Sequence, residues 1–288
     1  LFYGFWNWKL LGLIGISTLS AHYGALAIAS HTDSQRRYRV LFWTIVLNLA
    51  ILALFKYYNF FAESLQSLMT SVGVDVSIHT LRLTLPVGIS FYTFQAIGYV
   101  IDVYRRQAPA EGKLFNTALF VAFFPQLVAG PIERVSDLMP QLKGPRAQTY
   151  AKLSMGIYLI SAGVFKKVFI ADNLAVFTEQ IFDQPSSTAN GTLILIGVYA
   201  FAFQIYCDFS GYTDIARGIA KCLGMELSLN FRLPYFATSP QDLWRRWHIT
   251  LSQWLRDYLY IPLGGNRGNP WFTGRNLMLT MVLGGLWH

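Results

Sequence analysis

One histidine stands in a stretch rich in tryptophan and arginine, residues 244–265, which reads WRRWHITLSQWLRDYLYIPLGG. An imidazole titrates near neutral pH, so a buried histidine such as His248 can serve as a general base. At about 100° per residue, one amphipathic helix over 244–258 would place His248 on the apolar side, opposite the arginines. Two interpretations stay open: His248 takes part in chemistry, or it is a packed side chain bonded to a backbone carbonyl.

Three charged side chains lie in apolar or broken stretches. Asp208 stands inside FQIYCDFSGY, where an ionised group is costly unless it has a partner, so we expect a buried structural ion pair. The candidate partners are Lys166, Lys167, Arg217, Arg245 and Arg246. Glu133 and Arg134, in GPIERVSDL, either line the cytoplasmic mouth of a site or cap the next segment. Cys207 and Cys222 have no spacing typical of a metal site.

The elements that must position these residues are membrane spans. Of the 288 residues, 53% are hydrophobic and only 13% are charged, whereas soluble domains have about 25% charged residues. About 20 apolar residues cross a bilayer, and such runs predict helices over 8–29, 40–60, 86–103, 153–182 and 191–213, with a last one from 277. No run alternates like a barrel strand. The sequence therefore predicts an all-α, multi-pass transmembrane bundle with re-entrant and amphipathic helices around a central cavity.

Loop charge predicts the orientation of these helices. Short basic loops stay in the cytoplasm, so we expect 31–39 and 104–113 inside, and 61–85 and 183–190 outside. The apolar run 114–130 has basic residues on both flanks and is expected to be re-entrant, with a broken tip at FFPQLVAGP. The net charge of +8 is spread over short loops, which favours membrane lipid and not nucleic acid as partner.

Five stretches together resemble the membrane-bound O-acyltransferase (MBOAT) family. They are DLWRRWHITLSQWLRDYLYIPLGGNRG (242–268), GGLWH (284–288), LPVGISFYTFQAIGYVIDVYR (85–105), FFPQLVAGPIERVSDLMPQL (123–142) and QIYCDFSGYTDIARGIAKCLG (204–224). They are most similar to the branch that acetylates alginate and related bacterial exopolysaccharides. The resemblance runs through most of the chain and implies one domain over 1–288. Since the chain begins at Leu1 and stops at His288 inside an apolar run, we expect truncation at both ends.

The resemblance implies an O-acyltransferase of the bacterial inner membrane that transfers an acetyl or other acyl group to hydroxyls of an exported polysaccharide such as alginate. The implied donor is acetyl-CoA or another acyl thioester, without a tightly bound cofactor or metal. Accessory periplasmic acetylation proteins are implied partners, beside lipid, donor and acceptor. In this family the histidine of the LWH motif, here His288, is taken as the active-site residue, and His248 occupies a second motif position. No G-x-S-x-G elbow is present, so a histidine base acting on the acceptor hydroxyl is the expected chemistry.

Other functions stay open from the sequence. An enzyme of the same family could D-alanylate teichoic acid or O-acylate peptidoglycan. A transporter could move a polymer or an acyl donor without catalysis, but transporters are typically built from inverted repeats, and none is evident here. Acyl transfer also needs a donor that stabilises an oxyanion, for which Asn and Arg side chains are the candidates.

Overall fold

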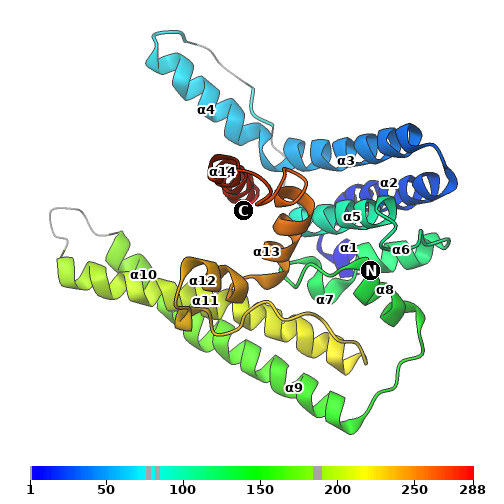
Figure 1. The fold of residues 1–288 in the computed structure, drawn as a ribbon. Helices are drawn as coiled ribbons and strands as arrows, with labels where there is room; N and C mark the ends of the chain where they lie inside the picture. The colour runs from blue at the N-terminus through cyan, green and yellow to red at the C-terminus, as the bar shows by residue number, and fades with distance from the viewer. Residues whose placement is uncertain (1, 76–78, 82–84, 184–189) are drawn as a thin grey trace. The chain divides into compact units, whose positions relative to one another are not determined.

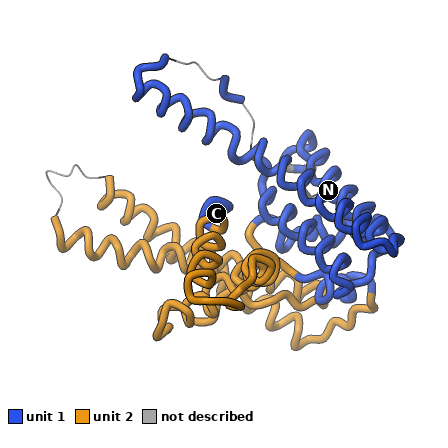
Figure 2. The backbone as a smooth tube through the Cα atoms, turned by 45° about the horizontal axis from the view of Figure 1, so that its top comes forward, with its two compact units in different colours: residues 1–128, 134–143, 285–288 blue, residues 129–133, 144–284 orange. Residues whose placement is uncertain are grey.

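The structure is a computed structural model that describes residues 2–75, 79–81, 85–183 and 190–288. Within these ranges every regular element is a helix (Figure 1), which confirms the predicted all-α class. The helices form two compact units (Figure 2). Unit 1 comprises residues 1–128, 134–143 and 285–288, and unit 2 comprises residues 129–133 and 144–284. One domain over the whole chain stays a prediction.

Four helical segments are long and apolar enough to cross a membrane: Trp8–Ser30, Ser34–Lys56, Tyr150–Phe182 and Gly191–Cys222. Each overlaps a predicted span and confirms it. The second begins at Ser34 instead of residue 40, because the side chain of Asp33 accepts a hydrogen bond from the Gln35 amide and caps the helix there. The arginines of the stretch 31–39 therefore lie on the first turns of a helix and not in a loop. The fourth span continues to Cys222, past the predicted residue 213.

Unit 1 is built around one buried helix. It contains α1 (Phe2–Asn7), α2 (Leu11–Ser30), α3 (Ser34–Lys56), α4 (Tyr58–Ser71), α5 (Ile89–Tyr104), α6 (Leu114–Val121), α7 (Phe124–Leu127) and α8 (Val135–Lys143). Every residue of α5 from Tyr92 to Val103 is buried, and both α2 and α3 pack against this helix. The predicted crossing over 86–103 corresponds to α5.

Polar side chains join the helices of unit 1. The buried Asn48 of α3 accepts a hydrogen bond of 2.5 Å from Ser17 Oγ and donates one of 2.8 Å to Ser20 Oγ, both on α2. Nδ1 of the buried His22 lies 2.9 Å from Thr117 Oγ1 on α6. In an apolar medium such bonds fix how neighbouring helices align. His22 is therefore a structural histidine.

The stretch 114–130 is broken, as expected for irregular backbone. Its helices α6 and α7 have eight and four residues, and eight helical residues reach only about 12 Å, short of the roughly 30 Å apolar core. Near the break, the side-chain amides of Gln95 and Gln126 both donate to the Phe120 carbonyl, at 3.1 and 3.3 Å. These bonds satisfy backbone that the break would leave unpaired. The re-entrant path itself stays a prediction, and most of the segment 183–190 lies outside the described residues.

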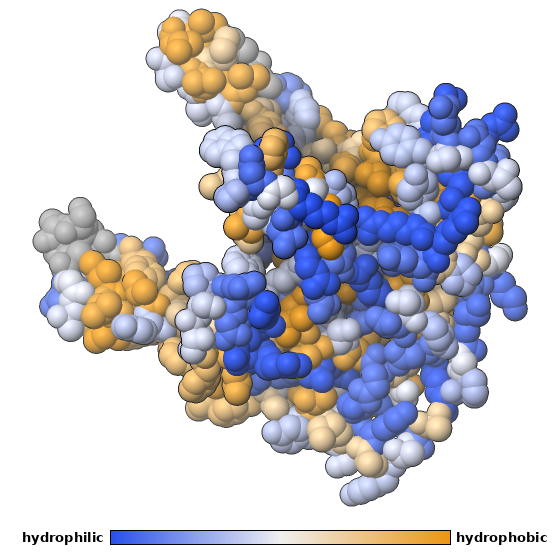
Figure 3. Space-filling view, viewed as in Figure 1, coloured by the Kyte–Doolittle hydropathy of each residue, from blue (hydrophilic) through white to orange (hydrophobic). Residues whose placement is uncertain are grey.

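Unit 2 combines two long helical segments with a loop-rich part. It contains α9 (Tyr150–Val164), the π-helical turn η2 (Phe165–Ala171), α10 (Asp172–Phe182), α11 (Gly191–Cys222), η3 (Pro234–Phe236), α12 (Pro240–Arg246), α13 (Ile249–Leu255), the π-helical turn η4 (Arg256–Tyr260) and most of α14 (Pro270–Trp287). Figure 3 shows apolar side chains gathered on α10 of this unit, and likewise on α4 of unit 1. Such exposed apolar helices fit a protein whose solvent is partly lipid.

Four glycines bring α9 and α11 into backbone contact. A Cβ added to Gly163 would lie 2.5 Å from the Gly211 carbonyl oxygen, and a Cβ on Gly156 would lie 2.9 Å from the Gly218 carbonyl oxygen. The pairing Gly163–Gly211 and Gly156–Gly218 means that the two helices run antiparallel, side by side in Figure 1. Small residues at such positions let membrane helices approach closely enough for extensive van der Waals contact.

We expect Gly163→Ala to destabilise the full-length protein, although alanine normally favours helix over glycine by about 1 kcal/mol. The new methyl group would meet backbone atoms of α11, which cannot move aside as a side chain can, and overpacking of this kind costs about 1–3 kcal/mol. Thermal unfolding in detergent measures the effect. Gly15→Ala on α2 is the matched control, because nothing lies within 4 Å of a Cβ there, and it should leave the midpoint equal or higher. Equal midpoints for the two variants would contradict the close contact.

Candidate active site

His248 lies between two helices and not within one. α12 ends at Arg246 and α13 begins at Ile249, and His248 has a left-handed backbone with φ of 40° and ψ of 56°. The prediction of one amphipathic helix over 244–258 is therefore wrong. Its prediction that the imidazole turns inward is confirmed, since His248 is only 3% exposed. Non-glycine residues rarely adopt this conformation, and they do so mostly where the surrounding structure holds them.

Hydrogen bonds to a second segment of the chain interrupt the helix at His248. In an unbroken helix the Arg246 carbonyl would accept from the Thr250 amide; here it accepts from the Arg232 amide at 2.9 Å. The Thr250 amide donates instead to Asn230 Oδ1 at 3.2 Å. The Ile249 amide likewise donates to the Asn230 carbonyl at 2.9 Å. Tertiary pairing thus replaces the hydrogen bonds that the helical periodicity of the sequence predicts.

The same asparagine orients the imidazole. Oδ1 of Asn230, a residue that is fully buried, accepts from Thr250 Oγ1 at 2.7 Å and lies 3.4 Å from His248 Nδ1. A backbone amide can only donate, so the Asn230 atom bonded to the Thr250 amide must be the oxygen. His248 Nδ1 must then carry a proton, because two lone pairs would repel. In the neutral ring this leaves Nε2 as the basic nitrogen.

Aromatic rings pack around this histidine. Phe209 of α11 meets the imidazole edge-on, with ring centroids 4.6 Å apart and an interplanar angle of 88°. Phe231 contacts both Phe209 and Trp247, at centroid distances of 5.1 and 5.0 Å. These rings exclude water, and a dry site strengthens any electrostatic interaction made inside it.

One buried polar atom beside His248, Asn230 Nδ2, has no hydrogen-bond partner among the described residues. Buried donors in folded proteins are nearly always bonded, so an unbonded amide next to an oriented histidine suits a site that binds a polar ligand. Asn230 is not predictable from the sequence, because it lies 18 residues before His248 and no motif or period connects the two.

Glu133 and Arg134 differ in their roles. The buried Glu133 accepts from the Ser228 amide at 2.6 Å and from Ser228 Oγ at 3.0 Å, which ties GPIER to the segment that carries Asn230. The adjacent Ile132 amide donates to Thr250 Oγ1 at 3.0 Å. In unit 1, Arg134 pairs with the buried Asp102 at 3.7 Å. Glu133 thus stabilises the loops around His248. This role differs from both predicted ones, which were to line the cytoplasmic mouth of a site or to cap the next segment.

Asp208 forms an ion pair with one of its predicted partners, but the prediction that this pair is buried is wrong. Its carboxylate lies 2.7 Å from Lys167 Nζ, on the π-helical turn η2. The pair is not buried within the unit, because the two side chains are 51% and 39% exposed. Lys166, the preceding residue, pairs separately with Asp214 at 2.7 Å. Asp208 therefore belongs to the packing of η2 on α11, apart from the rings around His248.

His288 follows the last residue of α14 and belongs to unit 1. The preceding Trp287 is buried, and its ring stacks on Phe94 of α5 with centroids 4.5 Å apart and an interplanar angle of 18°. Lys56 Nζ donates to the Trp287 carbonyl and lies 5.4 Å from the centre of its ring. These contacts anchor the backbone at His288, whose own side chain is exposed. His248 lies in unit 2, so a cavity shared by both histidines stays a prediction.

Known proteins resemble all or most of this chain. The model of the membrane-bound O-acyltransferase family matches residues 5–288. A probable alginate O-acetylase AlgI of Azotobacter vinelandii is 45% identical over 288 residues, which cover 100% of this chain and 57% of that protein. A peptidoglycan O-acetyltransferase of Helicobacter pylori is 39% identical over 100% of the chain and 58% of its own length. A teichoic acid D-alanyltransferase of Bacillus subtilis is 29% identical over 70% of the chain and 53% of its own length. The chain thus spans little more than half the length of these relatives.

Proposed function

Because this chain belongs to the membrane-bound O-acyltransferase family, we propose that the whole protein transfers an acetyl group from an acyl thioester to hydroxyls of an exported bacterial polysaccharide such as alginate. The observation that carries the proposal is the identity of 45% over the entire chain to a probable alginate O-acetylase. The proposed location is the bacterial inner membrane, where acetyl-CoA or another thioester is available from the cytoplasm. Accessory periplasmic acetylation proteins and lipid are proposed partners.

The proposed reaction uses a histidine as general base. His288 takes the proton of the acceptor hydroxyl while the hydroxyl oxygen attacks the thioester carbonyl carbon, which forms a tetrahedral oxyanion. The oxyanion collapses, the carbon–sulfur bond breaks, and the thiolate leaves and takes up the proton held by His288, which restores the neutral base. His248 contributes its Nε2 as a second polar group. The unbonded Asn230 Nδ2 supplies the kind of donor that an oxyanion needs, and no bound cofactor or metal is required.

A test of the acceptor uses the full-length protein in an alginate-producing bacterium that lacks its own alginate acetylase. We expect acetyl esters to return to the secreted alginate, measured by proton NMR of the purified polymer. The empty vector is the control. The 39% identity to a peptidoglycan O-acetyltransferase makes peptidoglycan the acceptor to compare, so its acetyl esters are measured in the same cells. Esters on peptidoglycan with none on alginate would contradict the proposed acceptor, and polymer export without any ester would favour a transporter.

A further inference from the structure

A cavity of about 400 Å³ opens within unit 1, at one end of three packed helices. It is lined by the end of α2, the start of α3 and the turn that follows α5, and its lining includes Ile28, His31, Arg37, Val103, Arg106 and Gln107. A water molecule occupies about 30 Å³ in the liquid, so the space admits a group much larger than water. Neither histidine of the candidate active site lines it.

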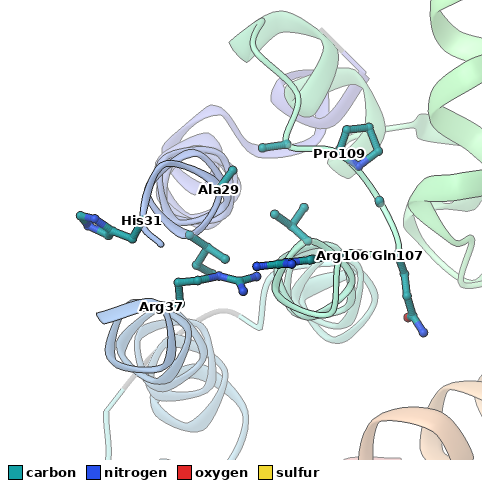
Figure 4. A pocket seen from close by; sticks show the side chains of 10 residues that line it. Ala29, His31, Arg37, Arg106, Gln107 and Pro109 are labelled. Carbon is teal, nitrogen blue, oxygen red and sulfur yellow. The ribbon is translucent and has the colours of Figure 1, made fainter. Parts of the chain in front are cut away.

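Two arginines converge on this cavity from different helices. Figure 4 shows the side chains of Arg37 and Arg106 pointing toward one another, while His31 points away. Arg37 is held in place, since its Nη2 donates to the Tyr104 carbonyl at 2.6 Å and its guanidinium lies 5.1 Å from the centre of the Tyr104 ring. Two guanidinium groups repel each other unless an anion lies between them.

Arg106 occupies a backbone position that favours glycine. The Gln107 amide donates to the Asp102 carbonyl at 2.8 Å and the Arg106 amide to the Val103 carbonyl at 3.1 Å, which is the Schellman pattern that ends a helix. The residue at this point is left-handed and usually glycine, and Arg106 adopts φ of 61° there. A side chain kept at a position that suits glycine better indicates a use for that side chain.

No acid lines the cavity among the described residues, and the neighbouring acids are engaged elsewhere. Asp33 caps α3 and pairs with Arg36 at 3.7 Å. Glu111 lies 2.8 Å from Lys143 Nζ. Burial raises the pKa of Glu111, but hydrogen bonds from Lys143, the Lys113 amide and Asn116 outweigh it and lower the pKa below its ordinary value. Glu111 therefore stays an anion bound to its own partners, which leaves the two cavity arginines able to bind an anion from outside the chain.

Aromatic residues indicate the depth of this cavity in the membrane. Tyr38, Phe42 and Trp43, on the first turns of α3, are 57%, 47% and 66% exposed. Exposed aromatic residues at the end of a span lie at the level of the lipid head groups. Arg37 directly precedes Tyr38, so the cavity lies where lipid phosphates are found.

We propose that the cavity between α2, α3 and the turn after α5 binds the phosphate of an anionic phospholipid, which Arg37 and Arg106 grip from two sides. The planar fork of a guanidinium matches two phosphate oxygens at once, and basic pockets between membrane helices bind anionic head groups. The site is independent of the proposed acyl transfer. It makes one lipid a structural partner of unit 1.

Native mass spectrometry of the full-length protein in detergent tests the site. Phosphatidylglycerol is titrated against wild type, Arg106→Gly, Arg106→Gln and Arg39→Gln. Loss of a site arginine should weaken the first phosphatidylglycerol adduct about fivefold or more. Arg106→Gly should do so without loss of thermal stability, because glycine suits the left-handed position. Arg39, an exposed residue of the same stretch that does not line the cavity, is the matched control and should change the affinity less than twofold.

Further arms distinguish a lipid from a soluble phosphate. Phosphatidylethanolamine should bind wild type no better than it binds Arg106→Gly, since its net charge is zero. Inorganic phosphate at millimolar concentration should not displace phosphatidylglycerol. Displacement by inorganic phosphate would overturn the assignment to lipid in favour of a soluble phosphate ligand. Equal weakening by Arg39→Gln and Arg106→Gln would overturn the site, because general charge attraction would then explain the binding.

Discussion

Alanine in place of His288 is expected to lower acetylation of the polymer by about 10²–10⁴-fold, the contribution of a general base. The substitution removes the group proposed to take the proton of the acceptor hydroxyl and leaves Trp287 stacked on Phe94. The measurement is the rate of acetyl ester formation on the polymer by membranes that contain equal amounts of wild type and variant. Tryptophan fluorescence on heating checks that the variant remains folded.

The matched control for this prediction is His79→Ala, which removes an exposed histidine of the same unit outside the helices. It should retain full activity. A loss of only a few-fold in His288→Ala would mean that another group is the base. Full activity of His288→Ala with alginate as acceptor would contradict the role of general base that the family resemblance implies for His288.

Alanine in place of His248 is expected to lower the rate by about 10²-fold, the lower end for a group that assists proton transfer. The informative companion is His248→Asn. Asparagine tolerates left-handed backbone, and its amide can hydrogen bond to Asn230 as Nδ1 does, but it has no atom in place of Nε2. We therefore expect His248→Asn to regain the stability that His248→Ala loses, and to remain slow. Acetyl ester formation and the unfolding midpoint are measured on both variants.

A different result in this pair would reassign the histidine. If His248→Asn is as active as wild type, the residue serves the packing around Asn230 through Nδ1, and the interpretation as a packed side chain is correct. If both variants keep full activity, neither nitrogen contributes. Ser136→Ala, which changes an exposed residue on α8, is the control for losses of activity that arise from preparing membranes with a variant protein.

The sequence predicts the spans well because membrane insertion depends on the sum of apolar side chains along a helix, which is a local property. It fails at His248 because the break depends on the segment around Asn230, whose backbone and side chain take over the hydrogen bonds of the helix. Asp208 does form an ion pair, as expected for an acid at membrane depth, but the predicted burial of the pair is wrong, since its side chains are 51% and 39% exposed. Which of the five candidate basic residues pairs with Asp208 depends on how η2 and α11 align. This alignment is a tertiary property that no local sequence pattern predicts.

In the candidate site, too, the sequence predicts some residues and not others. His248 and His288 are visible in the sequence because each stands in a motif. Asn230, which determines which nitrogen of His248 is basic, stands in the stretch SLNFRLPYF with no signal of its own. The contacts between the glycines of α9 and α11 are also not predictable from the sequence, because the spacing of these glycines indicates a contact only when the two helices are known to face each other.

The two glycine contacts between α9 and α11 also bear on how these helices find each other after insertion into the bilayer. Antiparallel helices can slide along one another, and a single glycine contact would allow several alignments of similar free energy. With two contacts, a slide that places Gly163 opposite Gly218 would bring Gly211 opposite Ile170, whose branched side chain forces the backbones apart. Only the native alignment keeps both contacts. Assembly of this pair can therefore reject a misaligned intermediate by its own packing.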